Sequence, residues 1–121
     1  MVIDTGIFID HLRKMNRDTT LLSQLPPNTL LYVSAITVYE LLAGATNNQK
    51  FQDAQRLLSA VTILPVDENV AALAAQLYQQ MKGNSIWLAD TLIAATALCH
   101  NLPLKTLNTR HFSRVSGLIV N

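Results

Sequence analysis

Apolar positions along this chain follow two alternating patterns, short continuous runs and longer stretches with helical spacing. The short runs favour buried strands, and they cover Met1–Asp4, Leu30–Val33, Val61–Leu64, Leu104–Thr106 and Leu118–Val120. Between the runs, apolar residues recur at intervals of three and four, which predicts helices. The expected helices are Thr5–Lys14, about Ala35–Ala45, Gln49–Ala60, a helix capped by Asp67 that ends at Gly83–Asn84, Trp87–Cys99 and a turn at Thr109–Phe112.

Polar residues mark where several of these helices begin. Ser34 and Asp67 directly precede helical stretches, where a side-chain oxygen can accept a hydrogen bond from the first turn. Asp18 or Thr19 is expected to cap a short additional helix that continues through Leu25, because the Pro26–Pro27 pair must end it.

Strands that alternate with helices predict a parallel sheet covered on both faces, which is an α/β fold. The length of 121 residues fits a single domain, residues 1–121, with about five short strands. In such folds ligands gather beyond the carboxyl ends of the strands. Asp4 ends the first strand, so we expect it at the functional edge.

Composition narrows the class of protein. Half of the residues are hydrophobic and 14% are charged, which argues against disorder, and the net charge of +1 indicates no global attraction to nucleic acid or membranes. The apolar stretches are broken before the ~20 residues needed to span a bilayer, and no signal peptide is evident. Cys99, the one cysteine, is expected as a small buried residue in a reducing compartment. A soluble cytoplasmic protein with no membrane partner is the expectation.

Three of the eight acidic residues lack a local explanation. Five are explained as helix caps, polar-face residues or neighbours of basic side chains: Asp10, Asp18, Asp53, Asp67 and Glu68. Asp4, Glu40 and Asp90 instead lie among apolar residues, where a lone carboxylate is unfavourable. Taken singly, each has a second interpretation as a partly exposed helix residue or as the partner of an arginine. Taken together they favour a site for a hard divalent cation.

Three stretches of the chain contain the acids that lack a local explanation. The opening "VIDTGIFIDHLRK" contains Asp4, "VSAITVYELLAGA" contains Glu40, and "IWLADTLIAATAL" contains Asp90. In the closing segment "LPLKTLNTRHFSRVSGLIV", a strand ends in Thr-x-Asn and leads to a short turn and a final strand. In these four ordered motifs the chain resembles the PIN-domain ribonucleases of the VapC toxin class, and the resemblance covers nearly the whole chain.

This resemblance implies a three-layer sandwich and a Mg²⁺- or Mn²⁺-dependent endoribonuclease that acts as the toxin of a toxin–antitoxin pair. Asp4, Glu40 and Asp90 would be the metal ligands and catalytic residues, supported by the hydroxyl groups of Thr5 and Thr106. Many members of the class have a fourth acid in the last motif, where this chain has Asn108. One well-occupied metal site is therefore expected. The implied partners are RNA, a cognate antitoxin and a second copy of the chain in a homodimer.

Basic residues near the acids are candidates for RNA binding. They are Arg13 and Lys14 after the first motif and Arg110 in the last, with Arg17, Lys105 and Arg114 as further candidates. His111 is expected to be structural or exposed, and Tyr39 and Trp87 are expected in the core or at an interface. The segments Ile7–Leu12 and Tyr39–Leu42 are the expected places for an antitoxin groove.

Two other functions compete with the nuclease. A catalytically silent PIN-like binding module is favoured by the neutral Asn108. A phosphoacceptor domain of the response-regulator type also places acids at strand ends, and Lys105 imitates its late lysine. That class expects two neighbouring acids near the first strand, whereas this strand ends in the single Asp4.

Overall fold

The computed structural model describes residues 1–81 and 87–121, and within them four short parallel strands form one sheet. The strands are β1 (Val2–Ile3), β2 (Tyr32–Ser34), β3 (Thr62–Leu64) and β4 (Leu104–Lys105). They lie in the order β3-β2-β1-β4. Val2 pairs with Tyr32 on one side and with Leu104 on the other. The chain's first strand is therefore an interior strand, and the predicted parallel sheet is confirmed.

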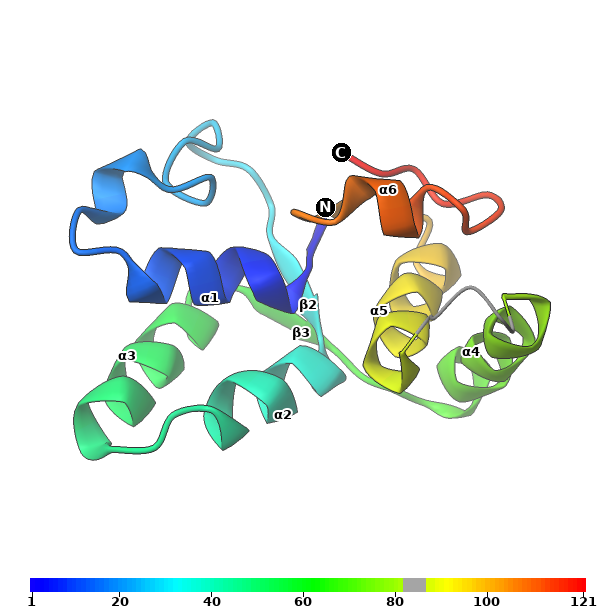
Figure 1. Ribbon diagram of the computed structural model, residues 1–121, viewed down its shortest axis with the longest axis horizontal. Coiled ribbons are helices and arrows are strands. Elements are labelled where there is room, and N and C mark those ends of the chain that lie inside the picture. The colour runs from blue at the N-terminus through cyan, green and yellow to red at the C-terminus, as the bar shows by residue number, and fades with distance from the viewer. Residues whose placement is uncertain (82–86) are drawn as a thin grey trace.

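Helices cover both faces of this sheet. Their bounds are α1 (Thr5–Arg13), α2 (Ala35–Ala43), α3 (Asn48–Leu58), α4 (Glu68–Gln80), α5 (Leu88–Cys99) and α6 (Thr109–Phe112). Helices α1, α2 and α3 lie on one side of the strands, and α4, α5 and α6 lie on the other (Figure 1). This arrangement is the predicted three-layer sandwich.

The two faces of the sheet bury two separate hydrophobic clusters. Because successive strand residues point to opposite faces, Val2 packs with α4 and α5, whereas the next residue, Ile3, packs with α1 and α2. Val33 joins the cluster around Ile3, and Tyr32 packs against the other. A strand buried on both faces must be apolar at every position, which explains the continuous apolar runs.

Helix α5 packs close to the sheet through small residues. Ala94, Ala95 and Ala97 are fully buried, and the Thr96 hydroxyl donates a 2.9 Å hydrogen bond to Ser34 Oγ at the end of β2. A side chain larger than alanine on this face would push the helix away from the strands. This packing holds the first turn of α5 near the carboxyl ends of the strands.

The expected N-caps are confirmed. Ser34 Oγ accepts a hydrogen bond from the Ile36 amide at 3.4 Å, and Asp67 Oδ1 accepts one from the Val70 amide at 2.9 Å. The helix end expected at Gly83–Asn84 lies outside the described residues.

The expected helix from Asp18 or Thr19 to Leu25 is wrong. In its place is one turn of 3₁₀ helix, η1 (Arg17–Thr19), which is capped by Asn16 and followed by turns. Here Thr20 Oγ1 bonds with His11 Nδ1 at 2.7 Å and with Ser23 Oγ at 2.8 Å. Such local side-chain bonds compete with helical backbone bonds, which is why the turn does not continue.

The expected last strand, Leu118–Val120, is reduced to a single parallel bridge between Val120 and Leu104. Gly117 turns the chain immediately before it, with φ of +82°. Cys99 is exposed at the end of α5, contrary to expectation. No helix in the described parts of the chain has the length and apolar character that a membrane span needs.

Candidate active site

Three carboxylates from three different elements share one region at the carboxyl edge of the sheet. Asp4 follows β1, Glu40 lies in α2, and Asp90 lies in the first turn of α5. Burial raises the pKa of Asp90, and the negative charges of Asp4 and Glu40 raise that pKa further. Asp4 and Glu40, far from Asp90 in sequence, are therefore close enough to influence it.

Asp4 is held by the neighbouring strand. Since β1 and β4 run in parallel, Thr106 comes to lie beside Asp4, and its hydroxyl donates a 2.6 Å hydrogen bond to Asp4 Oδ2. Asp4 occupies the N-cap position of α1, yet its carboxylate makes no capping hydrogen bond. Burial raises the pKa of Asp4, while the Thr106 hydroxyl acts in the opposite direction. The Thr106 contact therefore ties this carboxylate to the end of β4.

Glu40 is held by Thr5. The Thr5 hydroxyl donates a 2.7 Å hydrogen bond to Glu40 Oε1, and Thr5 Oγ1 lies 2.9 Å from Thr37 Oγ1 in a second hydrogen bond. Thr5 and Thr37 are buried, so the first turn of α1 and the first turn of α2 are joined by hydroxyl groups. Both threonines next to the acids thus contact a carboxylate, as the supporting role predicted for Thr5 and Thr106 requires.

Asp90 has a neighbour that sequence reasoning missed. His111 Nε2 lies 3.4 Å from Asp90 Oδ2, and the side chains are 14% and 23% exposed. The contact is electrostatic, without the alignment of a good hydrogen bond, since Nε2 has no hydrogen-bond partner among the described residues. The sequence held one sign of this contact. His111 lies one helical turn after Asn108, in the short helix that follows β4.

Asn108 itself is exposed, and its contact to the site runs through its backbone. Its amide donates a 3.0 Å hydrogen bond to Thr106 Oγ1, the same hydroxyl that bonds Asp4. Its side chain makes no capping bond to α6. The residue at the expected fourth acidic position therefore supports Thr106 rather than adding a charge.

The carboxylates do not form a ready-made cage. Over residues 1–81 and 87–121, no three His, Cys, Asp or Glu side chains stand in a group that could hold a metal ion. Mg²⁺ does not need such a group, because proteins commonly bind it through one or two carboxylates while water and substrate phosphate complete its coordination. Hard oxygen donors in a half-buried, negatively charged region fit such an ion.

The predicted basic residues differ in their surroundings. Lys14 is exposed and pairs with Asp10 at 3.8 Å within α1. Arg110 is exposed on α6, next to His111. Arg13 is exposed too, but it lines the same cavity as Glu40. Of Arg13, Lys14 and Arg110, Arg13 is therefore the one that lines a cavity together with Glu40.

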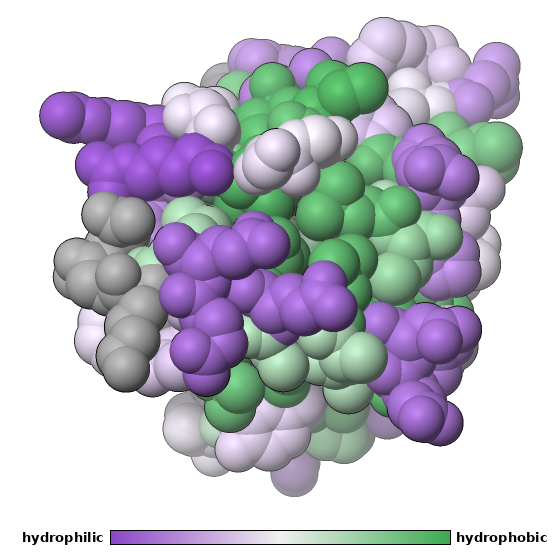
Figure 2. Space-filling model, turned by 90° about the vertical axis from the view of Figure 1, so that its right-hand side faces the viewer, coloured by the Kyte–Doolittle hydropathy of each residue, from purple (hydrophilic) through white to green (hydrophobic). Residues whose placement is uncertain are grey.

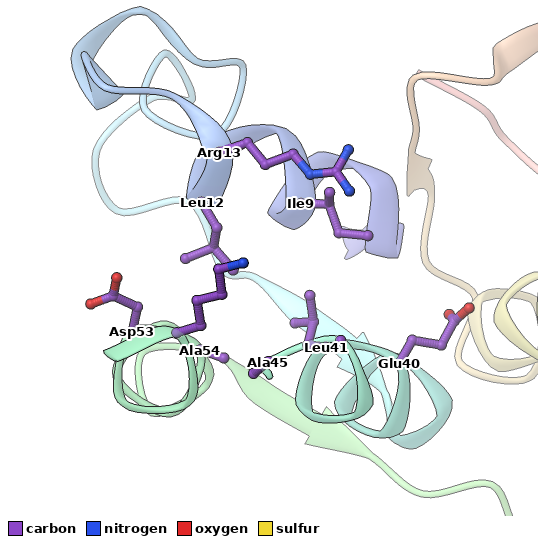
Figure 3. A pocket seen from close by; sticks show the side chains of 10 residues that line it. Ile9, Leu12, Arg13, Glu40, Leu41, Ala45, Asp53 and Ala54 are labelled. Atoms are coloured by element: carbon purple, nitrogen blue, oxygen red, sulfur yellow. The ribbon is translucent and has the colours of Figure 1, made fainter. Parts of the chain in front are cut away.

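That cavity lies between α1, α2 and α3 and has a volume of about 180 Å³. Ile9, Leu12 and Leu41 lie along its middle, with Glu40 at the end near α5 and Asp53 at the far end (Figure 3). Lys50 also lines it, a cation that sequence reasoning did not select. It is an apolar groove with charges at its ends, and it overlaps the two segments expected to bind an antitoxin.

Two aromatic side chains next to the acids are exposed, not in the core. Tyr39, adjacent to Glu40, is 69% exposed, and Trp87, one turn before Asp90, is 72% exposed. Their exposure rules out the core, one of the two expected places, and leaves the other, an interface. Exposed aromatic rings beside an acidic site offer stacking surfaces for nucleic-acid bases.

Comparison with known proteins gives one consistent result. The family model described as PIN domain matches residues 1–118. Ribonuclease VapC1 of Rickettsia felis is 34% identical, covering 99% of this chain and 93% of its own length, and ribonuclease VapC10 of Mycobacterium tuberculosis is 31% identical, covering 93% and 85%. A chain of a toxin–antitoxin complex from Klebsiella pneumoniae is 30% identical with a TM-score of 0.79, covering 98% of this chain and 94% of that one.

Proposed function

This chain belongs to the PIN domain family, and from that premise we propose that it is an endoribonuclease, the toxin of a toxin–antitoxin pair. Family membership excludes the response-regulator alternative. The observation that carries the proposal is the convergence of Asp4, Glu40 and Asp90 from separate elements, since the first two raise the pKa of Asp90.

We assign the metal to Asp4 and Asp90, with Glu40 acting on it through water. Asp4 and Asp90 carry raised pKa values from burial, so each carboxylate gains most from a cation. The buried Nε2 of His111 beside Asp90 marks a polar region that water or a ligand would complete. Carboxylate oxygens favour Mg²⁺ or Mn²⁺, and such an ion supplies charge neutralisation and an activated water.

The chain's own residues would place the RNA backbone. Thr106 fixes Asp4 and Thr5 fixes Glu40, so both carboxylates keep their orientation when a phosphate approaches. Arg13, Lys14 and Arg110 would offset the repulsion between the acids and the RNA, with Arg13 the nearest to Glu40 by its shared cavity. Tyr39 and Trp87 would stack on unpaired bases, which favours single-stranded or loop RNA. The same proposal includes the cytoplasm as the place where the protein acts on RNA.

The groove between α1, α2 and α3 would receive the antitoxin. Its apolar middle suits the apolar face of a helix or an extended segment, and Glu40 at its end suits an arginine of that segment. An arginine bound there would inhibit by competing with the metal for the acids.

A homodimer belongs to the same proposal. Apolar residues gather on the face of the molecule that holds α4 and the segment after α6, with hydrophilic residues around them (Figure 2). Exposed apolar surface of this kind is typical of contacts between protein chains. Light scattering of the purified protein, which reports a mass of one or two copies of 13.3 kDa, tests this part.

The function is tested by incubating antitoxin-free protein with a mixed RNA pool and Mg²⁺ or Mn²⁺. We expect cleavage that EDTA abolishes and that Asp90→Asn reduces at least 100-fold. Asp18→Asn, the same chemical change at an exposed residue outside the site, should cleave like wild type. No cleavage by wild type would establish the silent binding module instead. Equal cleavage by Asp90→Asn would refute the assigned site.

A further inference from the structure

His111 is a half-buried imidazole that the proposed reaction does not use. Its ring lies edge-on to Phe112, with centroids 5.4 Å apart and planes at 86°. Phe112 is 1% exposed and belongs to the cluster that packs under α4 and α5. The imidazole is thus positioned by the hydrophobic core, and its polar edge is what faces the site.

The groups that face this imidazole are acidic. Asp90 approaches from α5 to 3.4 Å, and the charge of His111 acts on Asp4 as well, where it favours the carboxylate form. A buried ring nitrogen with no hydrogen-bond partner among the described residues is costly, so an acceptor that approaches it is stabilising.

We propose that His111 is a positioning residue for Asp90, on which the proposed metal site depends. In this role Nε2–H would donate to Asp90 Oδ2 and hold the carboxylate in one orientation for the proposed cation. The present separation of 3.4 Å is slightly longer than the roughly 2.7–3.2 Å of a normal hydrogen bond. In metal sites, replacing a group that orients a ligand commonly lowers the metal affinity about 10- to 100-fold.

The fold supports this role. Helix α6 is one turn long, and its geometry is held by the bond from the His111 amide to the Asn108 carbonyl at 3.1 Å. Asn108 in turn donates to Thr106, which bonds Asp4. The closing segment therefore contacts both proposed ligands, Asp4 through Thr106 and Asp90 through His111.

Two variants separate positioning from packing. His111→Phe keeps a ring against Phe112 but removes the donor, and His111→Gln keeps an N–H donor on a smaller side chain. Mn²⁺ affinity is measured by calorimetry for both and for wild type, and the thermal midpoint Tm is recorded for each. We expect a 10- to 100-fold weaker Kd for His111→Phe, and a Kd within a few-fold of wild type for His111→Gln.

A double-mutant cycle with Asp90→Asn completes the test. If His111 acts through Asp90, His111→Phe has little further effect once Asp90 is replaced. The proposal is overturned if His111→Phe binds Mn²⁺ as tightly as wild type or more tightly. It is also overturned if His111→Phe and His111→Gln lose the same Mn²⁺ affinity and that loss parallels their fall in Tm. Failure of wild type to bind Mn²⁺ contradicts the proposed metal site itself, so the two failures are distinguishable.

Discussion

The Thr106 hydroxyl and the Asp4 carboxylate meet at 2.6 Å although 102 positions separate them in sequence. The parallel pairing of β1 with β4 makes this contact, since each residue directly follows its strand. Asp4 is 9% exposed and Thr106 is 3% exposed, so this is a charge-assisted hydrogen bond within the protein interior.

Thr106→Val should weaken metal binding at the proposed site, although valine has nearly the same shape as threonine. Without the hydroxyl, burial of Asp4 is opposed only by the Thr5 amide and the charge of His111, so the pKa of Asp4 rises further and the metal must displace a more tightly held proton. We expect Mn²⁺ affinity to fall about tenfold at pH 6 and less at pH 8. Thr106→Ser is the matched control, because it retains the hydroxyl. Identical affinities for the valine variant and wild type at both pH values would show that the bond has no such role.

Asp4→Asn should abolish RNA cleavage and stabilise the metal-free protein. Because its folded pKa is raised, Asp4 stabilises the fold fully below its unfolded pKa and loses that contribution as pH rises through the folded pKa. At pH 7 the neutral amide removes the cost of a buried charge, and Tm should rise by roughly 2–5 °C. At pH 3.5 the two proteins should melt at similar temperatures. A lower Tm for Asp4→Asn at pH 7 would contradict this expectation.

Ala45→Trp should separate inhibition from catalysis. Ala45 lines the groove, and an indole there would fill much of its volume of about 180 Å³. We expect normal RNA cleavage but at least tenfold weaker neutralisation by the cognate antitoxin. Ala43→Trp, an exposed position on the same helix end, is the control. Full neutralisation of Ala45→Trp would place the antitoxin elsewhere.

Tyr39→Ala and Trp87→Ala should affect substrate binding more than the chemical step. Stacking of one base on an aromatic side chain contributes about 1–3 kcal/mol, so KM for a single-stranded RNA should rise by about fivefold or more. The kcat should change less than twofold, and duplex RNA should show no added loss. Tyr39→Phe preserves the ring and serves as control. A fall in kcat alone would assign these residues to the chemistry instead.

The sequence alone predicted a sheet with helices on both faces, and it singled out three acidic residues as unusual. Both predictions have a clear physical reason. Continuous apolar strands and helical periodicity reflect burial, and buried carboxylates are costly enough to be conspicuous. Asp4, Glu40 and Asp90 therefore stood out before any geometry was known, and the structure places them in one region.

Features that depend on exposure or on long-range contacts were missed. Tyr39 and Trp87 lie in apolar helices, but which side of a helix meets solvent depends on the neighbouring elements. His111 became relevant only because α6 packs beside α5, which no local pattern reports. The short helix predicted near Thr19 does not form, because hydrogen bonds of the Thr20 hydroxyl compete with the helical backbone hydrogen bonds.

The pairing of the first strand with the last has a consequence for synthesis. Asp4 is synthesised 102 residues before Thr106, and His111 follows later still. Thr106 also depends on a later residue, because its amide donates a 3.3 Å hydrogen bond to the Asn121 carbonyl. A growing chain thus carries its acids without the residues that orient them, and contacts so distant in sequence form late in folding. We therefore expect the proposed nuclease activity to appear only once β4 has been made and has paired with β1, after most of the message has been read.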